Sequence, residues 1–324
     1  MKYTQVHQEF LKYFYSEVSI CMYSDLIIAT SGGQDSLALF KLMKDFQDTD
    51  NYNIHVTHCN HKWRNDSLDN SRELHYLTQY WGAYFHYYTS YTTLINELDA
   101  RKWRYETLIK LATKMQACQI LIAHTLTDKV ETFLYNLMRR YSIENRNFLL
   151  PLIYLTHNIQ LLRPLINISR IKTYWLCQLN YLPIWSDYTN YFLEKKRNRI
   201  RYEFLPYIKN HFSTQIESQL NSSFNLLKLQ SLYINSIVNN FLKLMLKQNR
   251  NKIKLNISLI DTLPLILQYQ VLKHFILYCF KAEISKEVIK KIICQIYRNK
   301  LPYFLTYKKH TIQIDKKCIY YHNI

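Results

Sequence analysis

An apolar run that ends in two adjacent glycines constrains the fold of this chain more than any other feature. The stretch reads Leu26-Ile27-Ile28-Ala29-Thr30-Ser31-Gly32-Gly33-Gln34-Asp35-Ser36-Leu37. The chain holds only 3 glycines in 324 residues, whereas average usage is about 7%. Paired glycines in such a chain indicate a backbone that tolerates no Cβ. The pattern predicts a buried strand, a tight turn and a helix N-terminus whose free N–H groups bind an anion such as phosphate. An ordinary turn without a ligand is the alternative.

Segments of strand and helix character alternate through the first half of the chain. Besides the first strand and the helix that the glycine turn opens, strands are predicted over residues 53–58, 84–89 and 119–124, and helices over residues 4–20, 66–80, 97–115 and 128–139. Strands about 30 residues apart with helices between them form βαβ units. We therefore expect an α/β fold with a doubly wound, mostly parallel sheet. Ligands of such sheets bind at the carboxyl ends of strands, where Ser31, His58 and His124 are expected to lie.

The glycine turn resembles a known nucleotide-binding loop. The string from Ser31 to Ser36, Ser-Gly-Gly-Gln-Asp-Ser, is similar to the loop of the PP-loop ATP pyrophosphatases. These enzymes cleave ATP between the α and β phosphates and adenylate a carbonyl-type oxygen. The loop differs from the Walker loop, which needs G-x-x-x-x-G-K-[ST]. The resemblance implies that Ser31, Gly32, Gly33, Gln34, Asp35 and Ser36 bind ATP, and that Asp35 is catalytic and holds Mg²⁺.

A second motif follows the fourth predicted strand and narrows the resemblance. One PP-loop family, the tRNA(Ile)-lysidine synthetases, usually shows H-H-x-D-D-Q-x-E-T here. The chain matches it at His124, Asp128, Glu131 and Thr132, and carries Thr125, Thr127 and Lys129 at the three other specified positions. The resemblance implies that Asp128 is a catalytic carboxylate that positions the lysine ammonium or a magnesium ion. A helix-capping carboxylate, with Glu131 completing a capping box, is the alternative.

Further segments of the same family occur in order along the chain. They include H-x-x-R after the second strand, A-R-x-x-R-Y, R-P-L, W-x-x-D-x-x-N and R-N-x-I-R. The residues for which the resemblance implies substrate or tRNA binding are His61, Arg64, Arg101, Arg104, His124, Glu131, Arg139, Asp187, Arg197 and Arg201. Without the resemblance, the arginines read equally as solvated basic faces. His58, Cys59 and His61 suggest a metal only weakly, because no other ligand has zinc spacing.

The charge balance points to a polyanionic partner. The chain holds 42 Lys and Arg against 24 Asp and Glu, which gives a net charge of +18 and a pI near 9.4. Such an excess attracts nucleic acid; a basic protein without a specific partner is the alternative. The seven cysteines include no C-x-x-C pair, and reduced thiols are expected.

The character of the chain changes after Pro206. Residues 1–205 are expected to form the PP-loop catalytic domain. Long amphipathic helices are predicted over residues 212–248 and 260–297, and residues 301–321 alternate like a closing hairpin. The family holds tRNA with a smaller, mainly helical domain, so the resemblance assigns this role to residues 206–324.

The resemblance implies a ligase that uses ATP, Mg²⁺ and L-lysine. The substrate is a tRNA(Ile) with a CAU anticodon, whose wobble cytidine is adenylated by ATP and then converted to lysidine. A homodimer is left open. The alternatives are another PP-loop enzyme, such as a tRNA thiolase, and a non-catalytic basic RNA-binding protein. The lack of C-x-x-C pairs disfavours the thiolase, and the intact loop disfavours the binding protein.

Composition also bears on location. Abundant Tyr, Ile, Asn and Lys with little Gly fits an A+T-rich coding bias. With no signal or transit peptide recognised at the N-terminus, and no apolar run near the roughly 18 residues of a membrane span, we expect no membrane partner. An organelle-encoded protein of the plastid (chloroplast) stroma is the expectation, and a bacterial cytoplasm the alternative.

Overall fold

The chain divides into two compact units, Met1–Ser222 and Ser223–Ile324. A computed structural model describes residues 4–17, 25–62, 66–90, 96–138, 149–185, 193–194, 196–249, 252–280, 285–298, 301–307 and 310–323. Compactness thus places the boundary after Ser222, whereas the sequence suggested residues 205 and 206.

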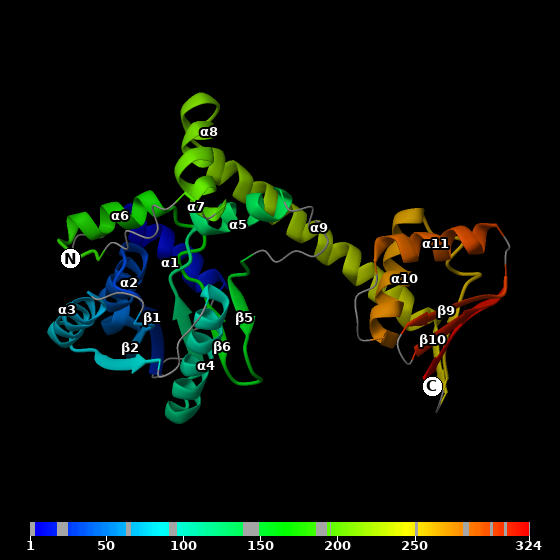
Figure 1. Ribbon diagram of the computed structural model, residues 1–324, viewed down its shortest axis with the longest axis horizontal. Coiled ribbons are helices and arrows are strands. Elements are labelled where there is room, and N and C mark those ends of the chain that lie inside the picture. Colours follow the sequence, from blue (N-terminus) through cyan, green and yellow to red (C-terminus); the bar gives the residue numbers. More distant parts are fainter. Residues whose placement is uncertain are drawn as a thin grey trace. The chain divides into compact units, whose positions relative to one another are not determined.

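A six-stranded sheet forms the centre of the first unit (Figure 1). Its strands are β1 (Asp25–Thr30), β2 (Asn53–Asn60), β3 (Tyr84–Thr89), β4 (Gln119–Ile122), β5 (Leu152–Tyr154) and β6 (Gln160–Leu162). Their order is β3-β2-β1-β4-β6-β5, and all neighbours are parallel except β5 and β6. The predicted doubly wound, mostly parallel α/β sheet is confirmed.

Helices connect these strands and cover the sheet. They are α1 (Gln5–Glu17), α2 (Gln34–Asp50), α3 (Ser67–Tyr80), α4 (Glu97–Met115), α5 (Leu126–Met138), α6 (Arg170–Leu179), α7 (Lys196–Arg199), a π-helical turn (Ile200–Phe204) and α8 (Leu205–His211). The alternation of β1 explains the two layers, because successive side chains point to opposite faces. Leu26 and Ile28 pack with Phe40 of α2, whereas Ile27 packs with Leu108 of α4.

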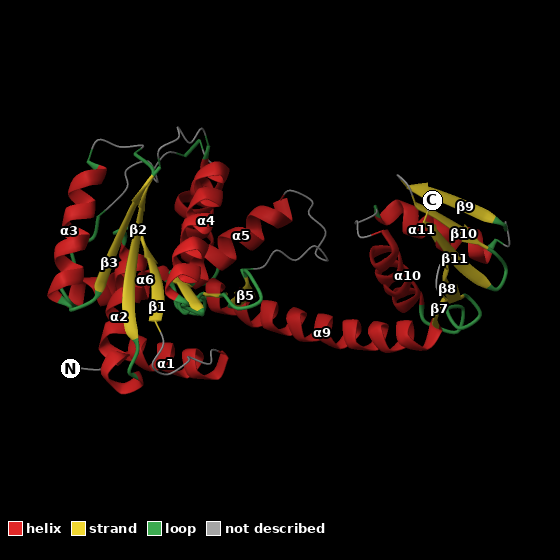
Figure 2. Cartoon of the chain, turned by 90° about the horizontal axis from the view of Figure 1, so that it is seen from below, coloured by secondary structure: helices red, strands yellow, loops and turns green. Residues whose placement is uncertain are grey.

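The second unit has its own helices, sheet and core (Figure 2). Helix α9 (Ile216–Met245) begins in the first unit and continues into the second. It is followed by β7 (Leu246–Asn249), β8 (Lys252–Asn256), α10 (Leu265–Phe280), α11 (Lys286–Tyr297), β9 (Tyr303–Tyr307), β10 (His310–Ile314) and β11 (Cys318–Asn323). The strands form an antiparallel sheet of order β7-β8-β11-β10-β9.

The helices of the second unit agree with the sequence prediction, but its sheet is larger than the predicted hairpin. Strand β7 begins inside a stretch predicted as helix, because pairing with β8 overrides the helical pattern there. No helix within the described ranges is long and apolar enough to cross a membrane.

Candidate active site

The glycine turn lies where the sequence predicted, between the carboxyl end of β1 and the start of α2. Gly32 has φ +80°, and a Cβ placed on it would lie 2.1 Å from Oδ1 of Asn70. Asn70, on α3, donates from Nδ2 to the carbonyl of Ser31 at 2.9 Å. The turn is therefore closed from outside by a side chain that leaves room only for glycine.

The turn presents the N-terminus of α2 without a side-chain cap. Gly33 is the residue before the helix and has no side chain to bind the first helical N–H groups. The Ser36 hydroxyl donates to the Gly33 carbonyl at 2.8 Å and accepts from the Ser31 N–H at 3.3 Å, which fixes the loop from within. Uncapped N–H groups and a helix dipole make this end suited to an anion.

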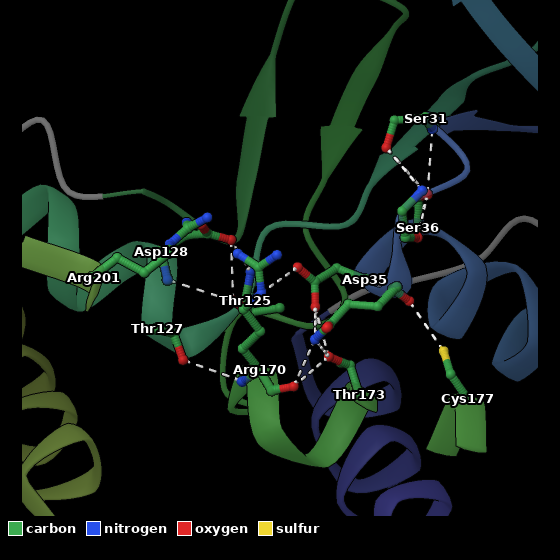
Figure 3. Close-up of polar contacts among 12 residues, drawn as sticks. Ser31, Asp35, Ser36, Thr125, Thr127, Asp128, Arg170, Thr173, Cys177 and Arg201 are labelled. Carbon is green, nitrogen blue, oxygen red and sulfur yellow. Dashed lines mark hydrogen bonds and ion pairs between the residues drawn. The ribbon is translucent and has the colours of Figure 1, made fainter. Parts of the chain in front are cut away.

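Asp35 stands in the first turn of α2 and is held from α6 (Figure 3). Thr173 donates to its Oδ1 at 2.6 Å, Gln34 donates to the same oxygen at 3.3 Å, and Nε of Arg170 lies 3.6 Å from Oδ2. Burial raises the pKa of this carboxyl; Arg170 opposes the rise, and the nearby Asp128 adds to it. The two predicted catalytic carboxylates therefore lie close enough to affect one another.

Asp128 and Glu131, on α5, form a compact ionic cluster with two arginines. Arg201 donates to Oδ1 of Asp128 at 2.8 Å and to both oxygens of Glu131 at 2.5 and 2.8 Å. Arg197 donates from Nε to Glu131 at 3.2 Å, and its Nη2 lies 3.7 Å from Asp128. Burial alone would raise the pKa of Asp128, but Arg201, His124 and the Thr125 N–H together hold it below its ordinary value.

Each departure from the family pattern at the second motif has a defined contact. Thr125 donates from its N–H and its hydroxyl to Oδ2 of Asp128 at 2.9 and 3.0 Å. This is the helix cap of α5, so the capping box pairs Thr125 with Asp128 rather than Asp128 with Glu131. The Thr127 hydroxyl accepts from the Arg170 N–H at 3.1 Å, and Lys129 donates to Asn221 at 2.7 Å.

His124 is held by a residue that the sequence did not single out for the site. Arg163 donates from Nε to Nδ1 of His124 at 3.3 Å. An arginine can only donate, so Nδ1 accepts and the ring proton lies on Nε2. Burial lowers the pKa of His124 to about 4, with Asp128 opposing and Arg163 adding to the effect. The ring is therefore neutral near pH 7, with Nε2 as its N–H donor.

The sequence of the chain is similar to those of known proteins. The sequence profile of the PP-loop domain family matches residues 2–208. The chloroplastic tRNA(Ile)-lysidine synthase of Gracilaria tenuistipitata var. liui is 35% identical over 323 residues, which cover 99% of each chain. The chain belongs to the tRNA(Ile)-lysidine synthase family. That of Cyanidium caldarium is 37% identical over 85% of this chain and 88% of its own, and the Nostoc enzyme is 38% identical over 72% and 68%.

A solved structure supports the fold alone. The U34-tRNA thiolase NcsA of Methanococcus maripaludis, described with its [4Fe-4S] cluster, matches with a TM-score of 0.58 and 13% identity, over 69% of this chain and 78% of that one. In the part of the present chain that the structure describes, no three His, Cys, Asp or Glu side chains are grouped to hold a metal ion. The likeness to the thiolase is therefore one of fold.

The remaining lysidine synthase segments gather partly on α4. His61, directly after β2, packs edge to face on Trp103 at 5.1 Å, and burial, Arg104 and His58 lower its pKa to about 4. Arg101 is exposed and lies 5.6 Å from the Tyr105 ring. Nε of Arg104 is buried without a hydrogen-bond partner among the described residues. Arg64, Arg139 and Asp187 lie outside the described residues.

Three residues of the site were not among the site residues predicted from the sequence. Arg163 belongs to the R-P-L segment. This segment indicated the family, but it did not predict the contact between Arg163 and His124. Arg170 and Thr173 gave no signal, because only the packing of α6 against α2 brings them to Asp35. Helix α6 also supports the loop through Cys177, whose thiol donates to the Gln34 carbonyl at 3.2 Å.

Proposed function

We propose that the chain ligates L-lysine to C2 of the wobble cytidine in the CAU anticodon of tRNA(Ile), with cleavage of ATP to AMP and diphosphate. The observation that carries the proposal is that Asp35 of the PP-loop and Asp128 lie in one site (Figure 3), joined through Arg170, which contacts both Asp35 and Thr127, in a chain of the lysidine synthase family. A PP-loop alone would suit any adenylating enzyme. The second carboxylate centre provides anionic groups for a cationic second substrate.

The first step is adenylation of the cytidine. The C2 oxygen attacks the α-phosphorus of ATP as the bond to diphosphate breaks, and diphosphate leaves with the electron pair. Charge develops on the leaving diphosphate, and fixed donors stabilise such charge best. We assign this role to residues 31–36, whose uncapped helix N-terminus offers backbone N–H groups.

Asp35 fits a magnesium ion that is shared with the nucleotide. Mg²⁺ is commonly bound through one or two carboxylates together with substrate phosphates. Asp35 offers a carboxylate at the loop, with Oδ2 only 3.6 Å from a cation already. When bound, the metal would neutralise phosphate charge. Asp35 itself would orient it, while Thr173 and Gln34 keep its Oδ1 in place.

The second step is attack of the lysine ε-amine on C2, with AMP as the leaving group. The amine must lose a proton before it attacks, and a neighbouring carboxylate is a suitable acceptor. We assign recognition and deprotonation of the amine to Asp128, supported by Glu131. Both carboxylates already bind guanidinium groups, so a lysine ammonium would take over an arginine contact at Asp128. Neutral His124 donates a hydrogen bond from Nε2 to a substrate oxygen.

We propose that polar side chains, most of them arginines, hold the tRNA. A cytidine in an anticodon loop is unpaired and can turn into a pocket. We propose contacts with tRNA from His61, Arg64, Arg101, Arg104, Arg139, Asp187 and Arg197. Of the described members, Arg101 is exposed and the Arg197 side chain is 43% exposed, so both have surface to offer a phosphate. We propose the same role for the domain beyond residue 205.

We also propose a setting for the reaction. The chloroplastic relatives and the A+T-type composition support the stroma of a plastid that encodes the chain, with a bacterial cytoplasm as the alternative. A homodimer is the assembly that we put forward for testing, and light scattering of the purified chain measures it.

The deciding experiment incubates the purified chain with ATP, magnesium, labelled lysine and unmodified CAU-anticodon tRNA(Ile). Label in the tRNA, with AMP and diphosphate released in equal amounts, is the expected result. ATP cleavage without incorporated lysine would mean that the acceptor is wrong. The Asp35→Ala variant is expected to lose the reaction while its tRNA affinity stays within about twofold, because Asp35 faces the nucleotide. Equal loss of both would contradict the assignment.

A further inference from the structure

Arg170, the first residue of α6, combines a backbone held by several hydrogen bonds with a guanidinium that makes few contacts among the described residues. Its N–H donates to the Thr127 hydroxyl at 3.1 Å, and its carbonyl accepts from Gln34 at 2.9 Å and lies 2.8 Å from the Thr173 hydroxyl. These bonds join the first residue of α6 to both α5 and the PP-loop. The Cα of Arg170 is therefore held firmly between the two motifs.

The guanidinium itself is loosely engaged. Among the described residues it forms an ion pair from Nε to Oδ2 of Asp35 at 3.6 Å, which is longer than a hydrogen bond. By contrast, Arg201 makes three hydrogen bonds to carboxylates and Arg163 donates to His124 and to a carbonyl. Arg170 is also 29% exposed. An arginine carries five N–H donors in a planar fork that matches phosphate.

The guanidinium of Arg170 points toward the PP-loop. Figure 3 shows the Arg170 side chain extending from α6 toward Asp35, with the Asp128 motif nearby. Asp35 is in the first turn of α2, so an anion at that helix N-terminus meets Arg170 beside it. A magnesium ion on Asp35 would take over the carboxylate charge that Arg170 now faces. The guanidinium would then be released toward the phosphates.

We propose that Arg170 is a further catalytic residue, which donates to the triphosphate of ATP and stabilises the diphosphate as it leaves. The inference rests on the proposed function only in naming ATP as the substrate. Arg170 neither gains nor loses a proton. Thr127, which stands where the family usually has aspartate, serves as a positioning residue because its hydroxyl holds the Arg170 backbone.

The test compares ATP with AMP as ligands of Arg170→Met, without tRNA or lysine. AMP lacks the diphosphate, so the variant is expected to lose about tenfold or more in ATP affinity and less than twofold in AMP affinity. In a separate assay with CAU-anticodon tRNA(Ile) added, single-turnover release of diphosphate is expected to fall by about 100-fold, the usual effect of removing one charge-stabilising donor. Unchanged ATP affinity and diphosphate release would overturn the inference, as would equal losses for both nucleotides.

Two variants complete the design. Lys172→Met removes a cation two residues further along α6, whose ammonium binds Glu9 at 2.6 Å. This variant is expected to bind ATP as the unchanged chain does. Arg170→Lys keeps the charge without the fork and is expected to lose ATP affinity to a smaller degree; it replaces the methionine variant should that variant fail to fold. If the unchanged chain binds ATP but makes no lysidine, the proposed function fails and this inference stands.

Discussion

Gly32 is constrained twice, by its backbone and by its neighbour. Its φ of +80° strains any residue with a Cβ, and Asn70 occupies the space that a Cβ would need. Gly82 shares only the first constraint, with φ +65° and no atom within 4 Å of its Cβ position. A Cβ at Gly82 would therefore meet backbone strain alone, whereas a Cβ at Gly32 would meet the strain and a steric clash.

We expect Gly32→Ala to abolish measurable ATP binding and Gly82→Ala to leave it unchanged. Both variants carry the backbone strain, of the order of 1–2 kcal/mol, but only Gly32→Ala must displace Asn70 and its bond to the Ser31 carbonyl. Isothermal titration with ATP measures the difference, and urea unfolding measures the shared strain. Equal ATP affinity in the two variants would show that Asn70 does not shape the loop.

His61 and His124 make stability depend on pH below neutrality. The pKa of each lies at about 4 in the folded chain against an ordinary 6.5, mainly because of burial. Between these values the unfolded chain binds protons that the folded chain does not, so the free energy of unfolding falls as pH falls from 6.5 toward 4. Above pH 6.5 neither histidine contributes to the slope.

The matching experiment is urea unfolding at pH 7, 6 and 5. His61→Gln and His124→Gln are each expected to flatten the fall in stability over this range, whereas the exposed His75→Gln serves as the control. An unaltered slope in both variants would mean that these rings are protonated in the folded chain.

The six residues of the loop were predictable because their chemistry is local. A strand, two glycines and a helix start within twelve residues need no distant partner to be recognised. The partners of Asp35 were not predictable, since Thr173 lies 138 positions away and donates only because α6 packs on α2. The arginines of residues 197–201 were assigned to substrate and tRNA, whereas the structure also pairs Arg197 and Arg201 with buried acid.

The α7 segment and the π-helical turn present their arginines to different surroundings. Arg201 contacts Glu131, whose side chain is fully buried, and Arg199 contacts Glu203, whose side chain is 47% exposed. Removing one partner of a buried pair leaves an uncompensated charge, which costs far more than removing an exposed pair. The segment is therefore attached to α5 through Arg201 and Arg197 rather than through Arg199.

We expect Arg201→Gln to lower the free energy of unfolding by about 3–5 kcal/mol and Arg199→Gln by less than about 1 kcal/mol. Both replace an arginine of the same short run, so helix propensity and net charge change alike. Urea unfolding of the two variants at pH 7 measures the contrast. Similar losses in the two would mean that Glu131 finds another partner or solvent.

Helices and strands of the first unit were largely predictable from periodicity. Residues 84–89 and 97–115 have the predicted bounds of β3 and α4. The domain boundary at residues 205 and 206 stays a prediction. The first compact unit extends further, to Ser222, because bonds between residues far apart in sequence hold the start of α9 to that unit. Asn221 accepts from Lys129 and donates to Asn167, and Glu217 accepts from Lys209. A change in composition near residue 206 contains no information about these bonds.

At the scale of the whole molecule, the chain carries a net charge of +18. The 42 Lys and Arg residues outnumber the 24 Asp and Glu residues, so not every basic side chain can pair with a carboxylate of its own. A protein that neutralises phosphates releases counterions from the nucleic acid, so its affinity falls linearly with salt on logarithmic axes. The slope counts the phosphate contacts.

We expect tRNA affinity to fall steeply between 50 and 200 mM salt, and Arg101→Gln to lower both the affinity and the slope by about one phosphate contact. Arg101 is exposed on α4, so its replacement would remove the proposed phosphate contact without leaving a buried partner. Arg72→Gln is the matched control, because Arg72 is 74% exposed on α3 and already contacts Asp69. Filter binding of the tRNA over a salt series gives both numbers. A flat salt response would mean that the basic excess does not contact the tRNA backbone, and an equal change in slope for both variants would place the contact elsewhere than on α4.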